Sequence, residues 1–139
     1  MDNKTREQRH VNMSRIHAQN TKPEVLVRKY LFGRGLRYRK NVKGLPGTPD
    51  IVLPKYKTVV FVHGCFWHGH EGCRYSVIPE TNQLFWKEKI AKNRCRDEEK
   101  KKELESLGWK VLTVWTCELK RKIDITNALN LLYMHIVGE

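Results

Sequence analysis

The sequence concentrates metal-binding side chains in residues 63–73, HGCFWHGHEGC, which hold three histidines and two cysteines. Thiolates and imidazoles are the usual ligands of structural zinc, which is almost always four-coordinate and tetrahedral. Cys117 lies just beyond a later apolar segment that ends at Trp115. If the segments ending at residues 63 and 115 form neighbouring strands, four ligands meet in a closed Cys3His zinc site. These ligands are Cys65, His70 and Cys73, in the spacing Cys-x4-His-x2-Cys, and Cys117.

A closed site leaves no coordination position for a substrate, so we assign this zinc to structure. In the alternative interpretation the cysteines are small buried side chains and His70 lies on the surface. Zinc is favoured because a loop with three glycines needs a staple, and structural zinc contributes on the order of 10 kcal/mol to folding. Cys95 has no partner nearby in the sequence and is predicted to be an unliganded thiol.

A second set of residues suits metal-dependent hydrolysis of a phosphodiester, which requires a carboxylate for a divalent metal and a base for water. Asp50 opens an apolar segment, and magnesium, which keeps several waters, needs few further ligands beyond a backbone oxygen near Val62. His68 lies between two zinc ligands, so the loop would hold its imidazole rigidly as a general base. His63 is a further candidate for a catalytic role. The alternative interpretations are that Asp50 caps a strand and that His63 is a histidine of the core. Glu24 is a secondary candidate, since a helix-capping role already explains it.

The elements that must position these residues can be read from hydrophobic periodicity and turn residues. Helices are predicted at 21–33, 82–107 and 124–137, and strands at 36–39, 50–53, 57–63 and 109–115. The two strands at 50–53 and 57–63 are expected to form a hairpin. This order predicts a mixed sheet with helices on both faces, a three-layer α/β/α domain.

Length and charge set the class of protein. The 139 residues are expected to form a single domain, 1–139, in which residues 1–20 are a basic N-terminal arm. Residues 1–49 hold 12 basic and 3 acidic side chains, a net charge of +9, whereas residues 78–139 hold 12 and 10, a net charge of +2. The basic front predicts nucleic-acid binding without distinguishing DNA from RNA. The sequence has no membrane-spanning run and no signal peptide, which predicts a cytoplasmic protein that binds no membrane.

Four motifs resemble those of the very-short-patch-repair (Vsr) DNA mismatch endonucleases, and the match runs over roughly residues 10–135. They are LPGxPD at 45–50, FxHGCFWH at 61–68, FWxxKIxxN at 85–93 and LGWxVLxVWxC at 107–117. The resemblance implies a restriction-endonuclease-like core. It also implies a magnesium-dependent enzyme that nicks the thymine strand at T:G mismatches left by deamination of 5-methylcytosine. A bacterial, nucleoid-associated protein follows, acting as a monomer on double-stranded DNA that contains a mismatch, with mismatch-repair proteins as further partners.

The resemblance also carries roles over to single residues. Asp50 and the Val62 carbonyl would bind magnesium, His68 would be the general base, and His63 would support catalysis. Cys65, His70, Cys73 and Cys117 would be the structural zinc ligands.

Further residues are assigned to DNA, as wedges between base pairs. Aromatic side chains can unstack a base step, at least cost where pairing is already poor. The candidates are Phe66, Trp67 and Trp86. For Met13 and Ile16 of the arm, the family resemblance implies that they insert or clamp from the other groove. For Trp86 the alternative is a helix contact with the core.

Two other functions remain open at this point. One is a related restriction or mobile-element nuclease that cuts matched duplex. The other is a catalytically inactive, zinc-stabilised DNA-binding module, in which Asp50 and His68 would have no role.

Overall fold

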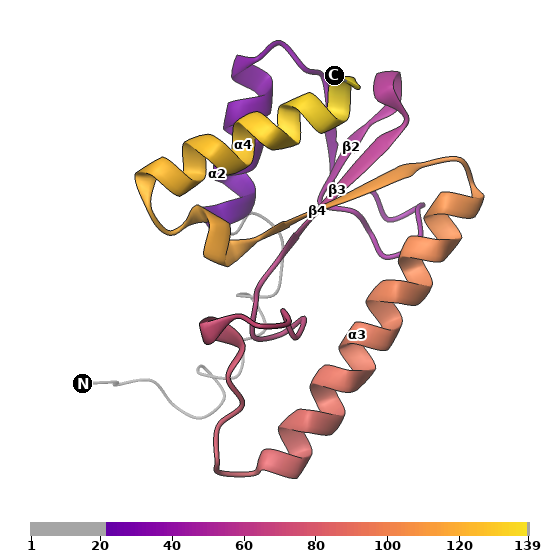
Figure 1. Ribbon diagram of the computed structural model, residues 1–139. Helices are drawn as coiled ribbons and strands as arrows, with labels where there is room; N and C mark the ends of the chain where they lie inside the picture. Colours follow the sequence, from indigo (N-terminus) through magenta and orange to yellow (C-terminus); the bar gives the residue numbers. More distant parts are fainter. Residues whose placement is uncertain (1–21, 139) are drawn as a thin grey trace, which may run out of the picture.

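The computed structural model describes residues 22–138, and Figure 1 shows the arrangement of their helices and strands. The helices are α2 (Lys22–Gly33), α3 (Gln83–Ser106) and α4 (Lys122–Val137), and the strands are β1 (Arg39–Lys40), β2 (Ile51–Leu53), β3 (Thr58–His63) and β4 (Lys110–Trp115). Short 3-10 turns cover Pro54–Tyr56, Arg74–Ser76 and Thr116–Leu119. Met13, Ile16 and the rest of the predicted arm, together with the Thr21 helix cap, lie outside the described residues.

The four strands form one mixed sheet in the order β1-β2-β3-β4. β2 and β3 are an antiparallel hairpin, as predicted, with Lys57 in the left-handed region (φ 51°) at the turn. β3 and β4 are parallel, with Thr58 opposite Lys110 and His63 opposite Trp115. This register brings the segments that follow His63 and Trp115 to the same edge of the sheet.

Helices cover both faces of the sheet, which confirms the predicted three-layer architecture (Figure 1). On one face α2 and α4 pack on β2, β3 and β4. The buried side chains of this core include Val27, Leu31, Ile51, Val60, Val114, Leu129 and Leu132. On the other face, the C-terminal part of α3 places Leu104 against Val52 and Val59. Alternation along β2 and β3 therefore sends successive side chains into two separate cores.

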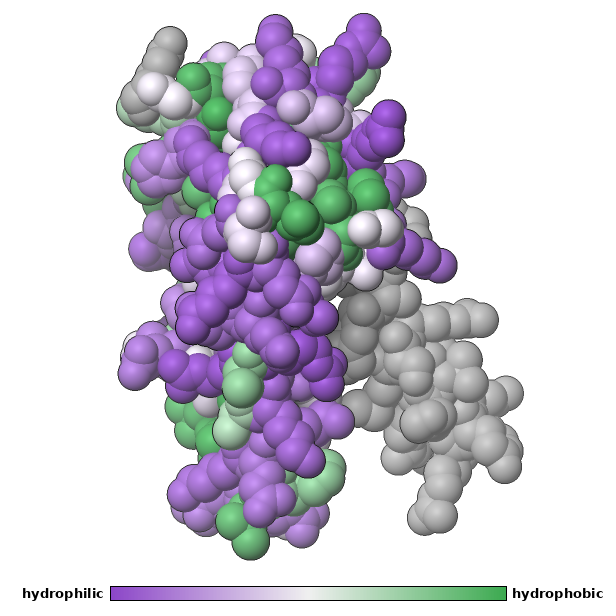
Figure 2. Space-filling view, turned by 90° about the vertical axis from the view of Figure 1, so that its right-hand side faces the viewer, coloured by the Kyte–Doolittle hydropathy of each residue, from purple (hydrophilic) through white to green (hydrophobic). Residues whose placement is uncertain are grey.

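α3 is longer than the sheet requires, and its N-terminal half extends past the strands (Figure 1). Ile90 and Leu104 are its buried residues, whereas Leu84 and Phe85 are 71% and 56% exposed. The apolar residues of α3 are thus buried only in part, because its first turns have no strand beneath them. Figure 2 shows the outer surface of this side of the molecule as mainly hydrophilic.

One predicted strand was largely wrong. The strand expected at 36–39 is reduced to Arg39–Lys40, because the backbone of Leu36 closes the end of α2 and is not available to a strand. Its amide donates to the Leu31 carbonyl at 3.1 Å, and its side chain lies in the core. Across residues 22–138, no helix has the length and apolar character needed to cross a bilayer.

Candidate active site and metal cluster

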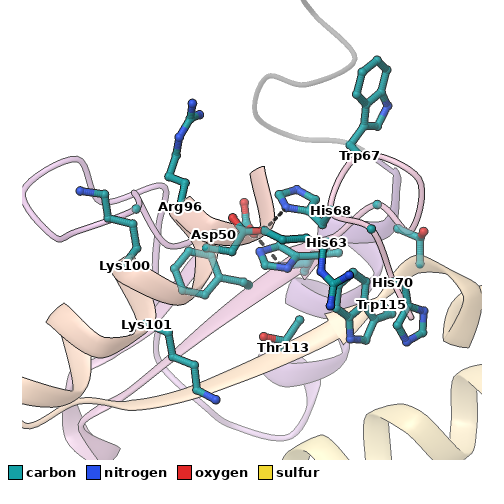
Figure 3. A pocket seen from close by; sticks show the side chains of 18 of the residues that line it. Asp50, His63, Trp67, His68, His70, Arg96, Lys100, Lys101, Thr113 and Trp115 are labelled. Carbon is teal, nitrogen blue, oxygen red and sulfur yellow. Dashed lines mark hydrogen bonds and ion pairs between the residues drawn. The ribbon is translucent and has the colours of Figure 1, made fainter. Parts of the chain in front are cut away.

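A cavity of about 1140 Å³ opens where β3 ends, between the loop after β3, the N-terminal end of α2 and the middle of α3. In Figure 3, His63 and His68 lie side by side near Asp50. Lys100 and Lys101 stand at the edge of the cavity, and Trp67 points away from it. The cavity therefore unites the predicted carboxylate and both predicted histidines with cationic side chains of α3.

Asp50 is fixed by the backbone on both sides. Its carbonyl accepts from the Asn41 amide at 3.1 Å, and its Oδ2 accepts from the Val62 amide at 2.7 Å. Burial raises the pKa of Asp50 to about 7; the Val62 hydrogen bond opposes this shift, and the nearby Glu24 carboxylate adds to it. Asp50 thus stands beside Val62, as the sequence predicts, in surroundings that favour its neutral form until a cation enters.

Glu24 stands closer to the centre of the site than its assignment as a helix cap implies. It is 5% exposed, it lines the cavity, and Arg28 donates to its Oε2 at 3.3 Å. Its charge and its hydrogen bonding both act on Asp50. Two carboxylates close together form an oxygen-rich donor set of the kind that magnesium prefers.

The two histidines form a stacked pair, with ring centroids 3.8 Å apart and planes inclined by 5°. His68 Nδ1 lies 2.6 Å from Asp97 Oδ2, which leaves Nε2 to exchange a proton with a reactant. Burial lowers the pKa of His63 to about 4; His68 lowers it further and Asp97 opposes the shift. His63 is therefore neutral at physiological pH.

Asp97 was missed in the sequence, although a signal exists. It is seven residues after Ile90 and seven before Leu104, the two buried residues of α3. Positions seven apart share one helix face, so Asp97 is a carboxylate on the inward stripe of the helix. A carboxylate on the inward face of a helix needs a hydrogen-bond or ion-pair partner in the fold.

The four predicted zinc ligands also meet. The donor atoms of Cys65, His70, Cys73 and Cys117 all lie within 4.8 Å of one another, and this group could hold a metal ion. Tetrahedral zinc with Zn–S bonds near 2.3 Å would place sulfurs about 3.8 Å apart, which fits this spread. Burial raises the pKa of Cys117 to about 12, and the neighbouring thiols Cys65 and Cys73 add to the shift. Cys95 is exposed on α3, outside the group.

The loop that carries these ligands is anchored on α3. A Cβ on Gly69 would lie 2.6 Å from Ile90 Cγ2, and Gly69 has φ +61°, so this close approach requires glycine. Asn93 Nδ2 donates to the Trp67 carbonyl at 2.8 Å. The segment around His68 is therefore pinned to the helix that supplies Asp97.

The three described aromatics predicted to contact DNA form one cluster. Phe66, Trp67 and Trp86 meet in edge-to-face contacts with centroids 5.2 to 5.8 Å apart. Trp86 packs on the loop and not on the sheet core, which removes the main alternative for this residue. The cluster stands at the projecting end of α3, next to the exposed Phe85.

The arrangement of this fold is shared with a solved nuclease. The catalytic domain of the homing endonuclease I-Bth0305I superposes with a TM-score of 0.55 and 25% identity over 86% of this chain and 97% of that domain. The mixed sheet, the helices on both faces and this likeness define an endonuclease of the restriction-endonuclease-like α/β class.

Sequence comparison narrows this class. The profile of the family described as DNA mismatch endonuclease Vsr matches residues 1–74. The chain belongs to the Vsr family of DNA endonucleases. It is 57% identical over 124 residues to the type II nicking enzyme V.NmeAIP of Neisseria meningitidis serogroup A, covering 89% of this chain and 88% of that enzyme. It is 42% identical over 116 residues to the DNA mismatch endonuclease Vsr of Escherichia coli, covering 84% of this chain and 74% of that enzyme. The predicted family and fold class are confirmed.

Proposed function

We propose that this chain nicks the thymine strand of double-stranded DNA at T:G mismatches, by magnesium-dependent hydrolysis of a phosphodiester. The observation that carries the proposal is the convergence of Asp50 and Glu24 with the His68–Asp97 pair in one cavity. The aromatic cluster beside the cavity supports a substrate with weakened base stacking, because wedges insert most easily at poor pairs. Relatives named as a mismatch endonuclease and as nicking enzymes support strand nicking.

Asp50 and the Val62 carbonyl would hold magnesium, with Glu24 placed to bind one of its waters. The residues fit such an ion, because burial and the neighbouring Glu24 carboxylate disfavour the charged form of Asp50, and a cation would offset this penalty. Bound magnesium would supply positive charge to the scissile phosphate. Lys100 and Lys101 at the cavity edge would add to that field and help hold the phosphate.

His68 would act as the general base through Nε2. Asp97 would accept a hydrogen bond from His68 Nδ1–H, which fixes the tautomer, and its charge would stabilise the imidazolium that forms when His68 takes a proton from water. His63, neutral and stacked on His68, would hold the ring in plane while adding no competing charge. Cys65, His70, Cys73 and Cys117 would bind a structural zinc that keeps the loop in shape.

DNA would be read on the outside of the cavity. Phe66, Trp67 and Trp86 would enter the stack at the mismatch, and Met13 and Ile16 would act from the opposite groove. The first half of α3 offers a polar face alongside, where Lys89, Lys92, Asn93 and Arg96 line a shallow groove. The cations Lys89, Lys92 and Arg96 would fix the register of the duplex through its phosphates.

Single-turnover nicking tests the proposal, with each strand labelled in turn. Wild type, Asp50→Ala, His68→Ala and the exposed control Glu99→Ala are compared with magnesium on T:G and fully paired duplexes in several flanking sequences. Nicking of the thymine strand alone, lost in the first two variants and kept in the control, supports the proposal. Equal cutting of paired DNA refutes mismatch specificity, and full activity of Asp50→Ala refutes the assigned site. Binding without any nicking would favour the DNA-binding module.

The names of several relatives favour one second candidate. They are called type II nicking enzymes, without reference to a mismatch. If the paired duplexes are nicked at a defined sequence, the chain is a nicking enzyme of matched DNA, and the chemistry assigned to the cavity stands unchanged.

A further inference from the structure

A basic cluster lies outside the cavity, on the part of the loop that follows the last of its metal-ligand candidates. Arg74 donates to the Tyr75 hydroxyl at 2.8 Å, and its guanidinium carbon stands 4.9 Å from the centroid of the Tyr75 ring. Lys120 Nζ stands 4.9 Å from the same centroid. Arg121 is close enough for its charge to oppose the rise in the pKa of Arg74 that the Tyr75 hydrogen bond causes. We call Arg74, Tyr75, Lys120 and Arg121 the tyrosine cluster.

The charges of the tyrosine cluster are only partly neutralised. Arg121 pairs with Asp124 at 2.9 Å, and Glu118 accepts from the Trp115 amide at 3.0 Å. Within residues 22–138, Arg74 and Lys120 have no carboxylate at ion-pair distance, and both are exposed. Two cations gathered on one aromatic ring without an anion repel each other, and the ring's own attraction for a cation is modest, about 0.5–1 kcal/mol at exposed sites. An anion in contact with both Arg74 and Lys120 would offset the repulsion between their charges.

The two halves of the cluster come from different parts of the chain. Arg74 and Tyr75 follow Cys73 directly, and Lys120 and Arg121 follow the turn Thr116–Leu119, which contains Cys117. The contact between Cys117 Sγ and His70 Nδ1, at 3.5 Å, joins the loop to that turn. The metal cluster therefore also assembles the tyrosine cluster at the end of the sheet where β3 and β4 finish (Figure 1).

We infer that the tyrosine cluster is a further phosphate-binding surface, which holds the backbone of the duplex on one side of the site of cleavage. Arg74 would contact a phosphate through its guanidinium fork and Lys120 as a point charge, with Tyr75 as the platform that holds both side chains. His70, Trp115 and Thr116 form part of the cavity wall. In the sequence, they lie shortly before the two segments that carry the tyrosine cluster. DNA bound in the cavity would therefore reach the cluster by extending in one direction only. This inference rests on DNA being the substrate.

The test is the salt dependence of DNA binding by Arg74→Ala/Lys120→Ala, measured by fluorescence anisotropy without magnesium. Each lost phosphate contact reduces the magnitude of the negative slope of log K against log salt by about 1. The slope of the double variant should therefore be shallower than that of wild type by about 2. The matched control is Lys55→Ala/Lys57→Ala. It removes two cations that also stand on aromatic rings, 5.6 and 4.4 Å from the centroids of Tyr56 and Trp109, at the opposite end of β3. Arg74→Lys, which keeps the charge, should retain the wild-type slope within error.

Two shortened duplexes make the inference sharper. Each lacks the DNA on one side of the mismatch, and only one of them should abolish the difference between the double variant and wild type. An unchanged slope, or an equal loss in the control, overturns the inference.

The same experiment separates this inference from the proposed function. If no duplex is nicked but the slope falls as expected, the phosphate surface stands and the enzymatic assignment fails. If nicking is normal and the slope does not move, the surface fails alone. Metal content and thermal unfolding of each variant exclude a loss of fold as the cause of either result.

Discussion

Removing Asp97 should slow nicking without weakening DNA binding. Its Oδ2 accepts from His68 Nδ1 at 2.6 Å, and both side chains are about 30% exposed. A hydrogen bond to a charged group contributes roughly 1.5–3 kcal/mol, and the partial exposure places this one in the lower half of that range. Since 1.36 kcal/mol corresponds to a factor of ten in rate, we expect Asp97→Ala to slow the single-turnover rate by about 13- to 45-fold.

The assay must separate positioning from charge. Asp97→Asn keeps a hydrogen-bond acceptor for His68 Nδ1 but cannot stabilise the imidazolium, so its rate should lie between wild type and Asp97→Ala. Glu99→Ala, which removes an exposed carboxylate two residues along the same helix, should leave the rate unchanged. If Asp97→Ala nicks within twofold of wild type while it binds DNA normally, His68 needs no partner and the mechanism assigned to this pair is wrong.

Three further perturbations follow from the geometry of the site and its loop. Asp50→Asn should stabilise the metal-free protein, because the pKa of the Asp50 carboxyl is raised from 3.8 to about 7 and the folded protein therefore loses stability as the pH rises through that window. In a pH series of urea unfolding, the gain in the free energy of unfolding should grow towards about 4 kcal/mol above pH 7 and should be absent below pH 4. Gly69→Ala should cost about 2–4 kcal/mol because its Cβ would lie 2.6 Å from a side chain of α3, whereas Gly72→Ala, with a similar φ but no atom within 4 Å, should cost only about 1 kcal/mol; equal losses in thermal unfolding would contradict the close packing. Cys73→Ser should abolish binding of one zinc ion per chain and lower Tm by about 10 °C or more, while Cys95→Ser should keep both values, as metal analysis and calorimetry can show.

The sequence predicts the framework well because the framework follows from local pattern. The apolar runs at 57–63 and 109–115 both become strands, and the long charged helix lies within a residue of its predicted limits. The first strand is buried over Thr58–Val60, whereas Val114 is the one buried residue of the second, which forms the edge of the sheet. What failed was Leu36, which looked like the start of a strand. Its backbone amide is used to close the end of α2, and a period-2 pattern of four residues carries no information about that choice.

The candidate site was predictable where its residues were neighbours in sequence, and not where the fold joins distant elements. The loop histidines and cysteines stand together in residues 63–73, so their chemistry could be inferred directly. Asp97 is 29 residues from His68, and only the packing of α3 across the sheet brings the two together. Glu24 was assigned to a helix end because its position fits a cap, whereas its burial beside Asp50 depends on how α2 lies on the sheet.

The parallel register of β3 and β4 explains why the candidate metal ligands and the two stacked histidines occur together. His63 pairs with Trp115, and the Trp115 ring contacts His63 on one side at 5.3 Å and stacks on His70 at 4.1 Å. His68 lies between the ligand candidates Cys65 and His70, so a metal held there would fix both ends of the segment that carries it. A slip of one residue between the strands would turn these side chains to the other face and separate both sites at once. The metal cluster can therefore govern activity while touching no substrate atom, through the position of one imidazole.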